Sequence, residues 1–415
     1  MALFSKQGSA ERLLSLVLIL SGSATYDWLA IRGYRAQRLA DRSDQDSLER
    51  AVALEPQSAE YHDLLCRNLI FVTEQTSRAT GECMKASELN PYSSTYWLDL
   101  AQAYLSSGDN IRSSVAVHKA VAVDPTTPDT AWSAANFLLI QGDLPAALHQ
   151  FSIALRGDPG LAAPILNTCW QSLHDTTLIQ GILPPKPDIY LSLIELLLAK
   201  GEPAAAHQIW LALMQLKPPF DYHQALFYVD NLLQAKDADG AEKTWEQLAS
   251  KSKTLQAYLR PGDLIVDGSF TQEILNSGFD WRYTPRPHVA LTLDTNEFHS
   301  DGRSLLLTYS ESGGDSGLFE YVVVQPNTRY QLTAWVKSQE LLTANGPRLT
   351  LSDAFDNKLV ASTDETAGST PWHHLDTEFR TGPVTKLLVL SISRVPADTR
   401  IQGQFWVDDI SLRPM

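Results

Sequence analysis

Four prolines recur at nearly constant spacing through the first part of the chain. They are Pro56, Pro91, Pro125 and Pro159, separated by 35, 34 and 34 residues. A period of this length suits one pair of antiparallel helices per unit, and each proline ends a helix because it cannot supply the next amide donor. Stacked helix pairs bury a continuous core and leave an extended concave surface for partners. The spacing therefore predicts an α-helical solenoid and favours a binding protein over an enzyme.

The residues inside each period agree with stacked helix pairs. One unit reads Trp97-x2-Leu100-Ala101-x2-Tyr104, then Gly108, Ser113, Val117, Ala120 and Pro125, and the next repeats Gly142, Ala147, Phe151 and Ala154. This pattern resembles the tetratricopeptide signature, W-x2-L-G-x2-Y followed by A-x3-F and P. The resemblance covers residues 42–258 and implies five or six hairpins that bind protein partners. A shortened unit is expected where Pro164 and Pro184-Pro185 interrupt the pattern.

The first helix of each hairpin is expected to face the concave surface of the solenoid. By register, the candidate protein-binding groove contains Leu98, Gln102, Trp132 and Asn136. Trp132 and Asn136 lie one helical turn apart, a spacing that suits a bound peptide. The alternative for Trp132 is packing against the preceding hairpin.

Residues 1–41 are expected to form an N-terminal signal-anchor or signal-peptide helix. Lys6 and Arg12 flank the start of the apolar run LLSLVLIL, from Leu13 to Leu20. An uncleaved anchor from Leu13 to Ile31 is long enough to cross a bilayer, and it would place the body in the periplasm on the inner membrane. Cleavage near Ala24 would instead release a secreted or periplasmic protein, and a buried helix running into the first repeat is the third interpretation. The arginines after Ile31 conflict with the positive-inside rule for a periplasmic body.

Charge and cysteine content limit the partners and the chemistry. The net charge is −15, which argues against nucleic acid as a main ligand because phosphate binding needs clustered Lys and Arg. The three cysteines, Cys66, Cys83 and Cys169, cannot all pair within one chain. Cys66 and Cys83 fall on the two helices of one expected hairpin, so they are either a disulfide or two small core residues.

The pattern changes from helical to alternating after about residue 260. Segments near 304–309, 317–324, 328–337, 347–352, 372–380, 385–393 and 402–412 alternate apolar and polar residues, with Gly, Pro, Asn and Asp between them. Strands at this density with turn signals between them predict an antiparallel β-sandwich, and eight or more strands predict a jelly roll. The expected fold class is thus an α-helical solenoid followed by a β-sandwich.

Three stretches of the second part resemble the jelly-roll carbohydrate-binding modules of the families 4, 9 and 22 group. They are Leu264 to Phe270, Val324 to Lys337, and the closing Trp406-Val-Asp408-Asp409-Ile410-Ser-Leu412. The resemblance covers residues 263–413 and implies a sandwich that contacts polysaccharide and often holds one structural calcium. Asp408 or Asp409, with Asp267, would supply ligands to that calcium ion. The alternative is that Asp408 and Asp409 are capping carboxylates at the end of a strand. No other cofactor is required.

An aromatic side chain stands out on the polar face of one expected strand. From Thr328 to Lys337, Tyr330, Leu332 and Ala334 share one face, whereas Trp335 lies on the other with polar residues. An exposed indole indicates a partner, here a stacked sugar ring; the alternative is packing under a loop or against the helices. Further glycan-binding candidates are Trp281, Tyr283, Trp372, His374 and Arg380, each with a core or loop-anchor alternative.

Catalytic patterns are weak. Gly314-Asp315-Ser316-Gly317 is similar to a serine-protease nucleophile loop but consists of turn formers. Glu311, Asp315 and Glu320 are close enough in sequence to suggest a glycosidase, which needs two opposed carboxylates. The favoured hypothesis is a non-catalytic, membrane-tethered adaptor in exopolysaccharide assembly or export. The alternatives are a structural scaffold that binds no sugar and, lower, a glycan hydrolase, which a deep acid-lined cleft between helices and sandwich would indicate.

Overall fold

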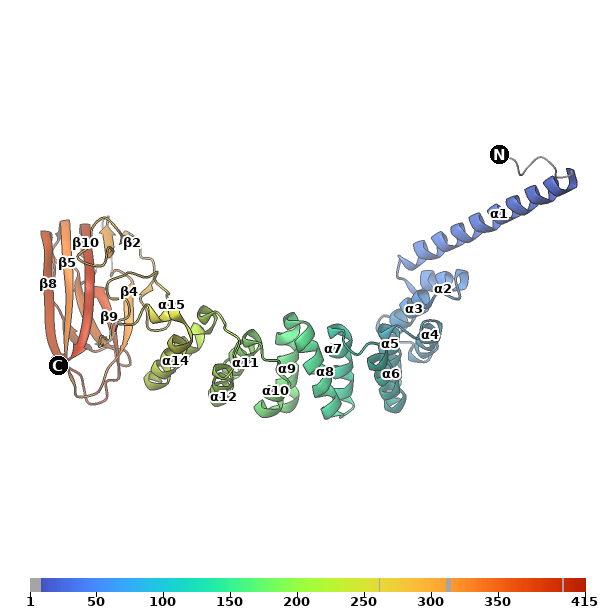
Figure 1. The fold of residues 1–415 in the computed structure, drawn as a ribbon, viewed down its shortest axis with the longest axis horizontal. Helices are drawn as coiled ribbons and strands as arrows, with labels where there is room; N and C mark the ends of the chain where they lie inside the picture. The colour runs from blue at the N-terminus through green and yellow to red at the C-terminus, as the bar shows by residue number, and fades with distance from the viewer. Residues whose placement is uncertain (1–8, 261, 311–314, 398) are drawn as a thin grey trace. The chain divides into compact units, whose positions relative to one another are not determined.

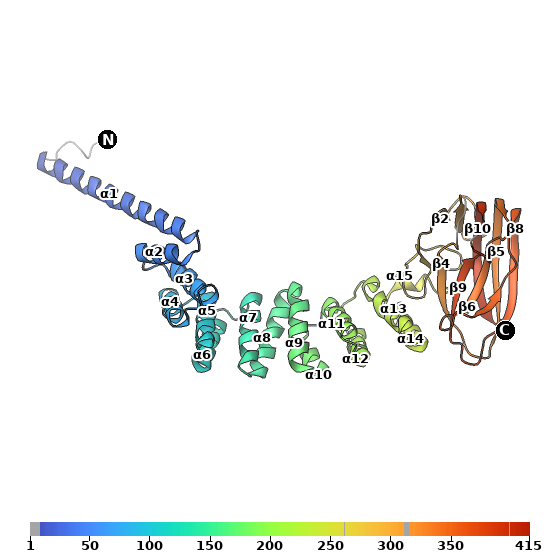
Figure 2. The same cartoon turned by 180° about the vertical axis from the view of Figure 1, so that it is seen from behind.

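The computed structural model describes residues 9–260, 262–310, 315–397 and 399–415 (Figure 1). Helices make up the first part and two β-sheets the last, as Figures 1 and 2 show from opposite sides. The chain divides into two compact units that meet in sequence between Ile209 and Trp210. The last helix ends at Gln256 and the first strand begins at Arg282, so the change of pattern falls where it was predicted.

Helix ends in the first unit follow the proline period. Pro56, Pro91, Pro125 and Pro159 each come two residues after a helix ends, at Leu54, Leu89, Val123 and Gly157. Ser58, Ser93, Asp109 and Asp143 cap the helices that follow by accepting hydrogen bonds from backbone N–H groups. The helices are α2 (Gln45–Leu54), α3 (Ala59–Phe71), α4 (Thr76–Leu89), α5 (Ser94–Ser106), α6 (Asn110–Val123), α7 (Pro128–Ile140), α8 (Leu144–Gly157), α9 (Ala162–Leu173), α10 (Thr176–Ile182), α11 (Pro187–Ala199) and α12 (Pro203–Met214), which runs across the unit boundary.

Small residues allow the helix backbones to approach each other. Ala101, Ala120, Ala147 and Ala154 are completely buried where the sequence places close contacts. Gly142, after α7, has a φ of +82° with open space around it, so backbone conformation rather than space selects glycine there. The irregular unit is confirmed: α10 has only seven residues, and Pro184-Pro185 follow its end.

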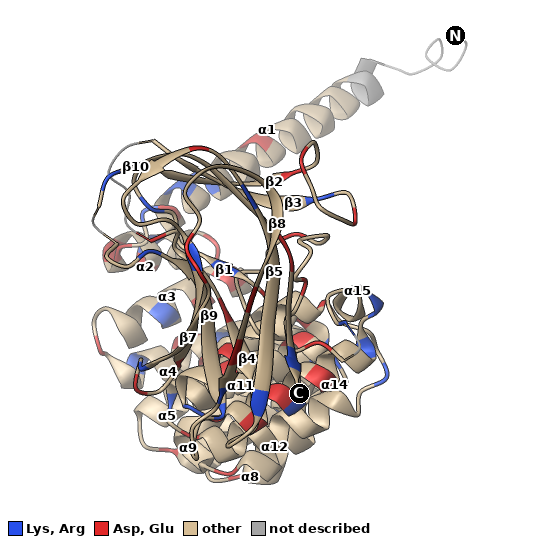
Figure 3. Cartoon of the chain, turned by 90° about the vertical axis from the view of Figure 1, so that its left-hand side faces the viewer, with Lys and Arg blue, Asp and Glu red and all other residues tan. Residues whose placement is uncertain are grey.

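One helix, α1 (Ser9–Ala40), precedes the repeats. The large apolar side chains between Leu13 and Ile31 are exposed, for example Leu13 at 68% and Ile19 at 67%. It is the one described helix long and apolar enough to cross a membrane. Figure 3 shows its basic residues near its C-terminal end, after a stretch with few charged residues. Large exposed apolar surfaces of this kind mark contact sites for another molecule or a membrane.

The second unit combines α13 (Leu226–Gln234), α14 (Ala238–Lys251) and α15 (Lys253–Gln256) with a sandwich of two antiparallel five-stranded sheets. One sheet has the order β1-β4-β9-β6-β7 and the other β2-β3-β10-β5-β8. The strands are β1 (Arg282–Tyr283), β2 (Val289–Asp294), β3 (Ser304–Tyr309), β4 (Leu318–Val323), β5 (Arg329–Thr343), β6 (Arg348–Asp353), β7 (Leu359–Ser362), β8 (Gly368–Arg380), β9 (Leu387–Ser393) and β10 (Ile401–Pro414).

The alternation predicted for β5 holds in the sandwich. Tyr330, Leu332, Ala334 and Val336 are buried in the core between the sheets, and Trp335 lies on the opposite, outward face. Burying a large apolar side chain contributes about 1.5–3 kcal/mol, so this division of faces determines which side chains remain outside.

Candidate functional site

Four ring-bearing side chains gather on the outward face of the sheet β2-β3-β10-β5-β8. Trp335 of β5 lies opposite His374 of β8, with ring centroids 5.5 Å apart. His299, from the loop between β2 and β3, lies flat on Trp335 at 3.9 Å and is 6.0 Å from Trp372 of β8. We call these four residues the aromatic platform. Trp335 and Trp372 are half-buried and His374 is exposed.

Two carboxylates of β10 hold His299 in place. Asp409 Oδ2 lies 2.7 Å from His299 Nδ1, and Asp409 Oδ1 accepts hydrogen bonds from the hydroxyls of Ser300 and Ser269. Asp408 Oδ2 accepts from the backbone N–H groups of His299 and Ser300, at 2.8 and 3.0 Å. A break in the pairing register between Asp408 and Ser411 turns both carboxylates toward this loop. The aromatic platform is therefore built by residues that are distant in sequence.

The environments of the two carboxylates differ. Burial raises the pKa of Asp408 to about 6. Burial also favours a higher pKa for Asp409, but the hydrogen bonds from His299, Ser300 and Ser269 outweigh this effect. The pKa of the Asp409 carboxyl is therefore lowered. Both groups thus serve as hydrogen-bond acceptors that anchor a loop.

The three calcium candidates do not converge. Asp267 instead accepts hydrogen bonds from the backbone of Thr271 and Gln272, each at 2.9 Å. No group of three or more His, Cys, Asp and Glu side chains in the described ranges is arranged to hold a metal ion. The geometry favours the capping role for Asp408 and Asp409, and the structural calcium implied by the resemblance stays a prediction.

Polar side chains continue along the same face beside the aromatic platform. Thr333 of β5 pairs with Asp376 of β8, and Gln331 pairs with Glu378. Asp376 and Glu378 are exposed, so hydroxyl, amide and carboxylate groups are available to the hydroxyls of a ligand. Arg380 lies six residues, or about 20 Å, along β8 from His374 and donates to the backbone oxygen of Asn327. It does not join the aromatic platform.

Two other glycan-binding candidates lie elsewhere. Trp281 is completely buried in the sandwich core with its ring 5.2 Å from Phe270, so the prediction that it meets a sugar is wrong and the core-anchor alternative holds. Tyr283 belongs to the other sheet and is half-buried against the core. On that sheet, Phe319 and Tyr321 of β4 line a hollow of about 330 Å³ that the sequence did not indicate.

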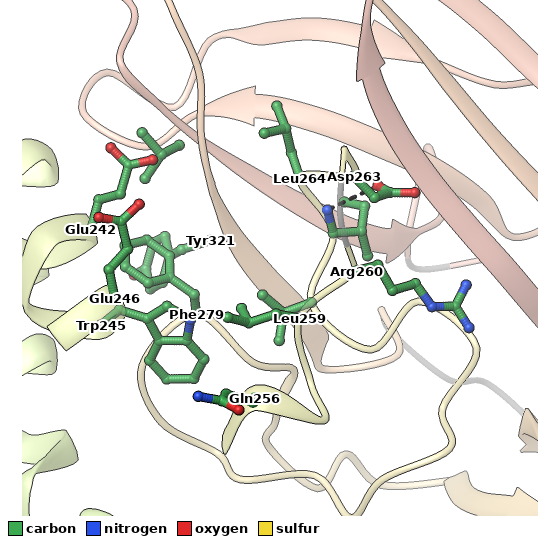
Figure 4. Close-up of a pocket in the computed structure, with 13 residues that line it drawn as sticks. Glu242, Trp245, Glu246, Gln256, Leu259, Arg260, Asp263, Leu264, Phe279 and Tyr321 are labelled. Atoms are coloured by element: carbon green, nitrogen blue, oxygen red, sulfur yellow. Dashed lines mark hydrogen bonds between the residues drawn. The ribbon is translucent and has the colours of Figure 1, made fainter. Parts of the chain in front are cut away.

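A second hollow, of about 510 Å³, lies within the second unit beside α14 (Figure 4). Trp245 of α14 and Phe279 meet edge to face at 5.9 Å, and Glu242 and Glu246 stand one turn apart on the same helix. Burial and the nearby Glu246 raise the pKa of Glu242. Asp263 lies on the opposite side in Figure 4, but its Oδ1 accepts the backbone N–H groups of Ile265 and Leu412, and its side chain is buried.

The glycosidase candidates do not form an opposed pair. Glu320 is completely buried, accepts a hydrogen bond from the Val266 N–H, and has its pKa raised well above the ordinary range by that burial. Asp315 accepts from the Arg394 N–H, and Glu311 lies outside the described residues, as does Gly314 of the protease-like tetrapeptide. In the hollow beside α14 the two accessible glutamates share one wall, so neither region presents two free carboxylates across a gap.

The repeat-groove candidates are half-buried on first helices. Trp132 packs against Phe151 of its own hairpin, with ring centroids 5.7 Å apart. The Asn136 amide donates to the Trp132 backbone oxygen and the Gln102 amide to Ser106 Oγ. Leu98 lies on α5 beside them in sequence. These four positions stay predicted contacts for a protein partner.

A buried carboxyl pair on first helices was not predicted. Asp63 of α3 and Asp99 of α5 hydrogen bond to each other, and burial and this neighbour raise the pKa of Asp63 to about 8. Asp63 Oδ1 and Asp99 Oδ2 have no N–H or O–H donor, which one shared proton explains. In the sequence the two aspartates are 36 residues apart, close to the repeat period.

Known structures resemble both parts of the chain, although no protein-family model and no curated protein matches it. A family 4 carbohydrate-binding module is 12% identical over 36% of this chain and 99% of its own, with a TM-score of 0.29. PilF of Pseudomonas aeruginosa is 17% identical over 48% of this chain and 96% of its own, with a TM-score of 0.28. A TPR protein of Thermus thermophilus is 16% identical over 49% and 99%, with a TM-score of 0.28. The predicted fold class, helical hairpins followed by an antiparallel β-sandwich, is confirmed by the helices and sheets themselves.

Proposed function

We propose that this chain is a non-catalytic, membrane-tethered adaptor of the cell envelope. The helical repeats bind protein partners, the sandwich contacts glycan, and α1 holds the body at the inner membrane on its periplasmic side. Exopolysaccharide assembly or export is the process that would use both surfaces together.

The observation that carries the glycan contact is the aromatic platform with open polar groups beside it. Sugar rings stack on aromatic faces while their hydroxyls hydrogen bond to neighbouring side chains. Trp372 and His374 present aromatic surface next to Asp376 and Glu378, which are exposed on the same strand. A ligand that stacks on the covered face of Trp335 would first displace His299.

A glycan array probed with the detergent-solubilised full chain tests this contact. Wild type should bind at least one glycan, and Trp335→Ala and Trp372→Ala should each weaken binding about tenfold or more, since covering one large apolar side chain contributes about 1.5–3 kcal/mol. Phe319→Ala, on the other sheet, should bind as wild type does. If only Phe319→Ala lost glycan binding, the binding site would lie on the other sheet. If wild type bound no glycan, the proposed glycan contact would be contradicted.

The second candidate function is a structural scaffold whose sandwich binds no sugar. The stacked His299 favours it, because a covered indole face is what a loop anchor produces. The same glycan array distinguishes the scaffold from the glycan-binding adaptor, because a scaffold gives no glycan signal at any concentration.

Tethering and the absence of catalysis have separate supports. The exposed apolar run of α1 supports a membrane anchor, and the pairing of Cys66 with Cys83 supports an oxidising compartment. The lack of two accessible opposed carboxylates in the described regions supports a non-catalytic sandwich. Carbonate extraction of membranes and a polysaccharide-turnover assay test the two claims; release into the supernatant, or turnover abolished by Glu242→Gln, would contradict them.

A further inference from the structure

A hollow of about 710 Å³ lies between the end of α1 and α2, within the first unit. The two helices pack together there, and Ala36, Ala40 and Leu48 are buried. The hollow combines four guanidinium groups with apolar surface. Its main lining residues are Arg35, Arg38, Arg42, Arg50, Tyr34 and Leu54.

The four lining arginines form no ion pair in the described part of the chain. Arg32, just outside the hollow, pairs with Glu55 at 2.8 Å and thereby ties α1 to α2. The other arginine ion pairs all lie elsewhere and involve none of Arg35, Arg38, Arg42 and Arg50. The nearby Asp44 caps α2 by accepting the Ser47 N–H at 2.9 Å. Four neighbouring positive charges repel one another, and a bound anion would relieve that repulsion.

The position of the hollow along α1 matches the headgroup layer of a bilayer. The apolar run from Leu13 to Ile31 spans about 28 Å at 1.5 Å per residue, close to the hydrocarbon thickness of about 30 Å. Arg35 and Arg38 then lie about 6 and 10 Å beyond Ile31 along the helix axis. Phosphate groups of lipids occupy this depth, and Arg binds phosphate with two parallel hydrogen bonds.

We propose that this hollow binds the headgroup of an anionic phospholipid. Arg35 and Arg38 of α1, Arg42 of the turn after α1 and Arg50 of α2 hold the phosphate. Tyr34 and Leu54 cover the apolar atoms next to the phosphate, and the acyl chains lie along the apolar part of α1. The bound lipid would fix α2, and with it the first repeat, at the membrane surface. This inference rests on the proposed membrane anchor, and it gives the arginines that follow Ile31 a ligand on whichever side of the membrane they lie.

Native mass spectrometry of the detergent-solubilised full chain tests the proposal with three probes: dioctanoyl phosphatidylglycerol, dioctanoyl phosphatidylcholine and inorganic phosphate. Wild type should retain phosphatidylglycerol and little phosphatidylcholine. Arg50→Gln lies outside α1, so it leaves membrane insertion intact, and it should weaken phosphatidylglycerol binding about tenfold. The quadruple variant with Gln at 35, 38, 42 and 50 should lose it. Arg112→Gln, an exposed arginine on α6, is the matched control and should bind as wild type does.

Equal phosphatidylglycerol retention by wild type and the quadruple variant would overturn the site. Inorganic phosphate binding as tightly as phosphatidylglycerol would show a soluble anion as the ligand and overturn the lipid assignment. Because the titration is done in detergent, it reports on the hollow independently of the anchor. If the chain bound phosphatidylglycerol but was released from membranes by carbonate, the lipid site in the hollow would be supported and the proposed membrane anchor would be contradicted.

Discussion

His299 lies flat on Trp335, with ring centroids 3.9 Å apart and ring planes within 11° of each other. Asp409 Oδ2 holds the imidazole through Nδ1, at 2.7 Å. The loop between β2 and β3 therefore determines how much of the indole a ligand can reach, and the carboxylates of β10 determine where that loop lies.

Removal of the stacked imidazole should uncover Trp335. We expect His299→Ala to lower the free energy of unfolding by about 0.5–1.5 kcal/mol, the contribution of one aromatic pair. Oxidative footprinting read out by mass spectrometry should show Trp335 becoming more reactive. His373→Ala, next to His374 on the same strand, is the control and should leave Trp335 unchanged; equal reactivity of Trp335 in both variants would mean that His299 does not cover it.

Stability of the repeats should fall as pH rises. The raised pKa of Asp63, about 8, means that the folded state binds one more proton than the unfolded state between about pH 4 and pH 8. Its contribution is fully present below about pH 4 and is lost as pH rises through about 8. Asp63→Asn should flatten this dependence in denaturant titrations at several pH values. Asp129→Asn, exposed at the start of α7, should keep the wild-type slope, and an unchanged slope in Asp63→Asn would rule out the shared proton.

The cysteines should titrate as one free thiol. The structure joins Cys66 to Cys83, whose Cα atoms are 5.3 Å apart, and leaves Cys169 free and buried. Thiol counting after unfolding should therefore give one thiol without reductant and three with it. Closing a loop of this length contributes about 3 kcal/mol, so reductant should also lower the unfolding midpoint. Three thiols in the unreduced chain would contradict the pairing.

Asp230 of α13 should matter more than a surface ion pair within the same unit. Its carboxylate accepts from Ser277 Oγ at 2.7 Å, from the Gly278 N–H at 2.8 Å and from Arg282. We expect Asp230→Ala to cost about 1–3 kcal/mol because one buried and two half-buried donors lose their partner. Asp239→Ala breaks only the exposed pair with Lys386 and should cost at most about 1 kcal/mol. Denaturation experiments that follow the unfolding of the second unit would compare the two variants. Equal losses of unfolding free energy would contradict the expected difference.

The alternation of apolar and polar residues along the sequence predicted most of the strands. β3, β4, β5, β6, β8, β9 and β10 match the predicted segments to within a few residues at their starts, and β5 and β10 extend further. β1, β2 and β7 were missed. β1 has only two residues, and β7 has four residues whose side chains show no alternation between buried and exposed.

The residues of the candidate site divide in the same way. Trp335 and Trp372 follow from alternation along single strands, a local property. His299 has no such signal, because it reaches Trp335 from a loop 36 residues away in sequence. Trp281 was mistaken for a surface residue because a segment without periodicity gives no indication of which side of the chain is buried.

The amino-acid order alone determined the 34-residue helical period, the change to alternation near residue 260 and the apolar N-terminal run, since each depends on neighbours along the chain. Tertiary structure alone decided that Asp408 and Asp409 anchor a loop, that Asp63 meets Asp99, and that four arginines of α1, α2 and the turn between them line one hollow. Those contacts join residues far apart in sequence, and their distances, burial and charge environment exist only after the chain has folded.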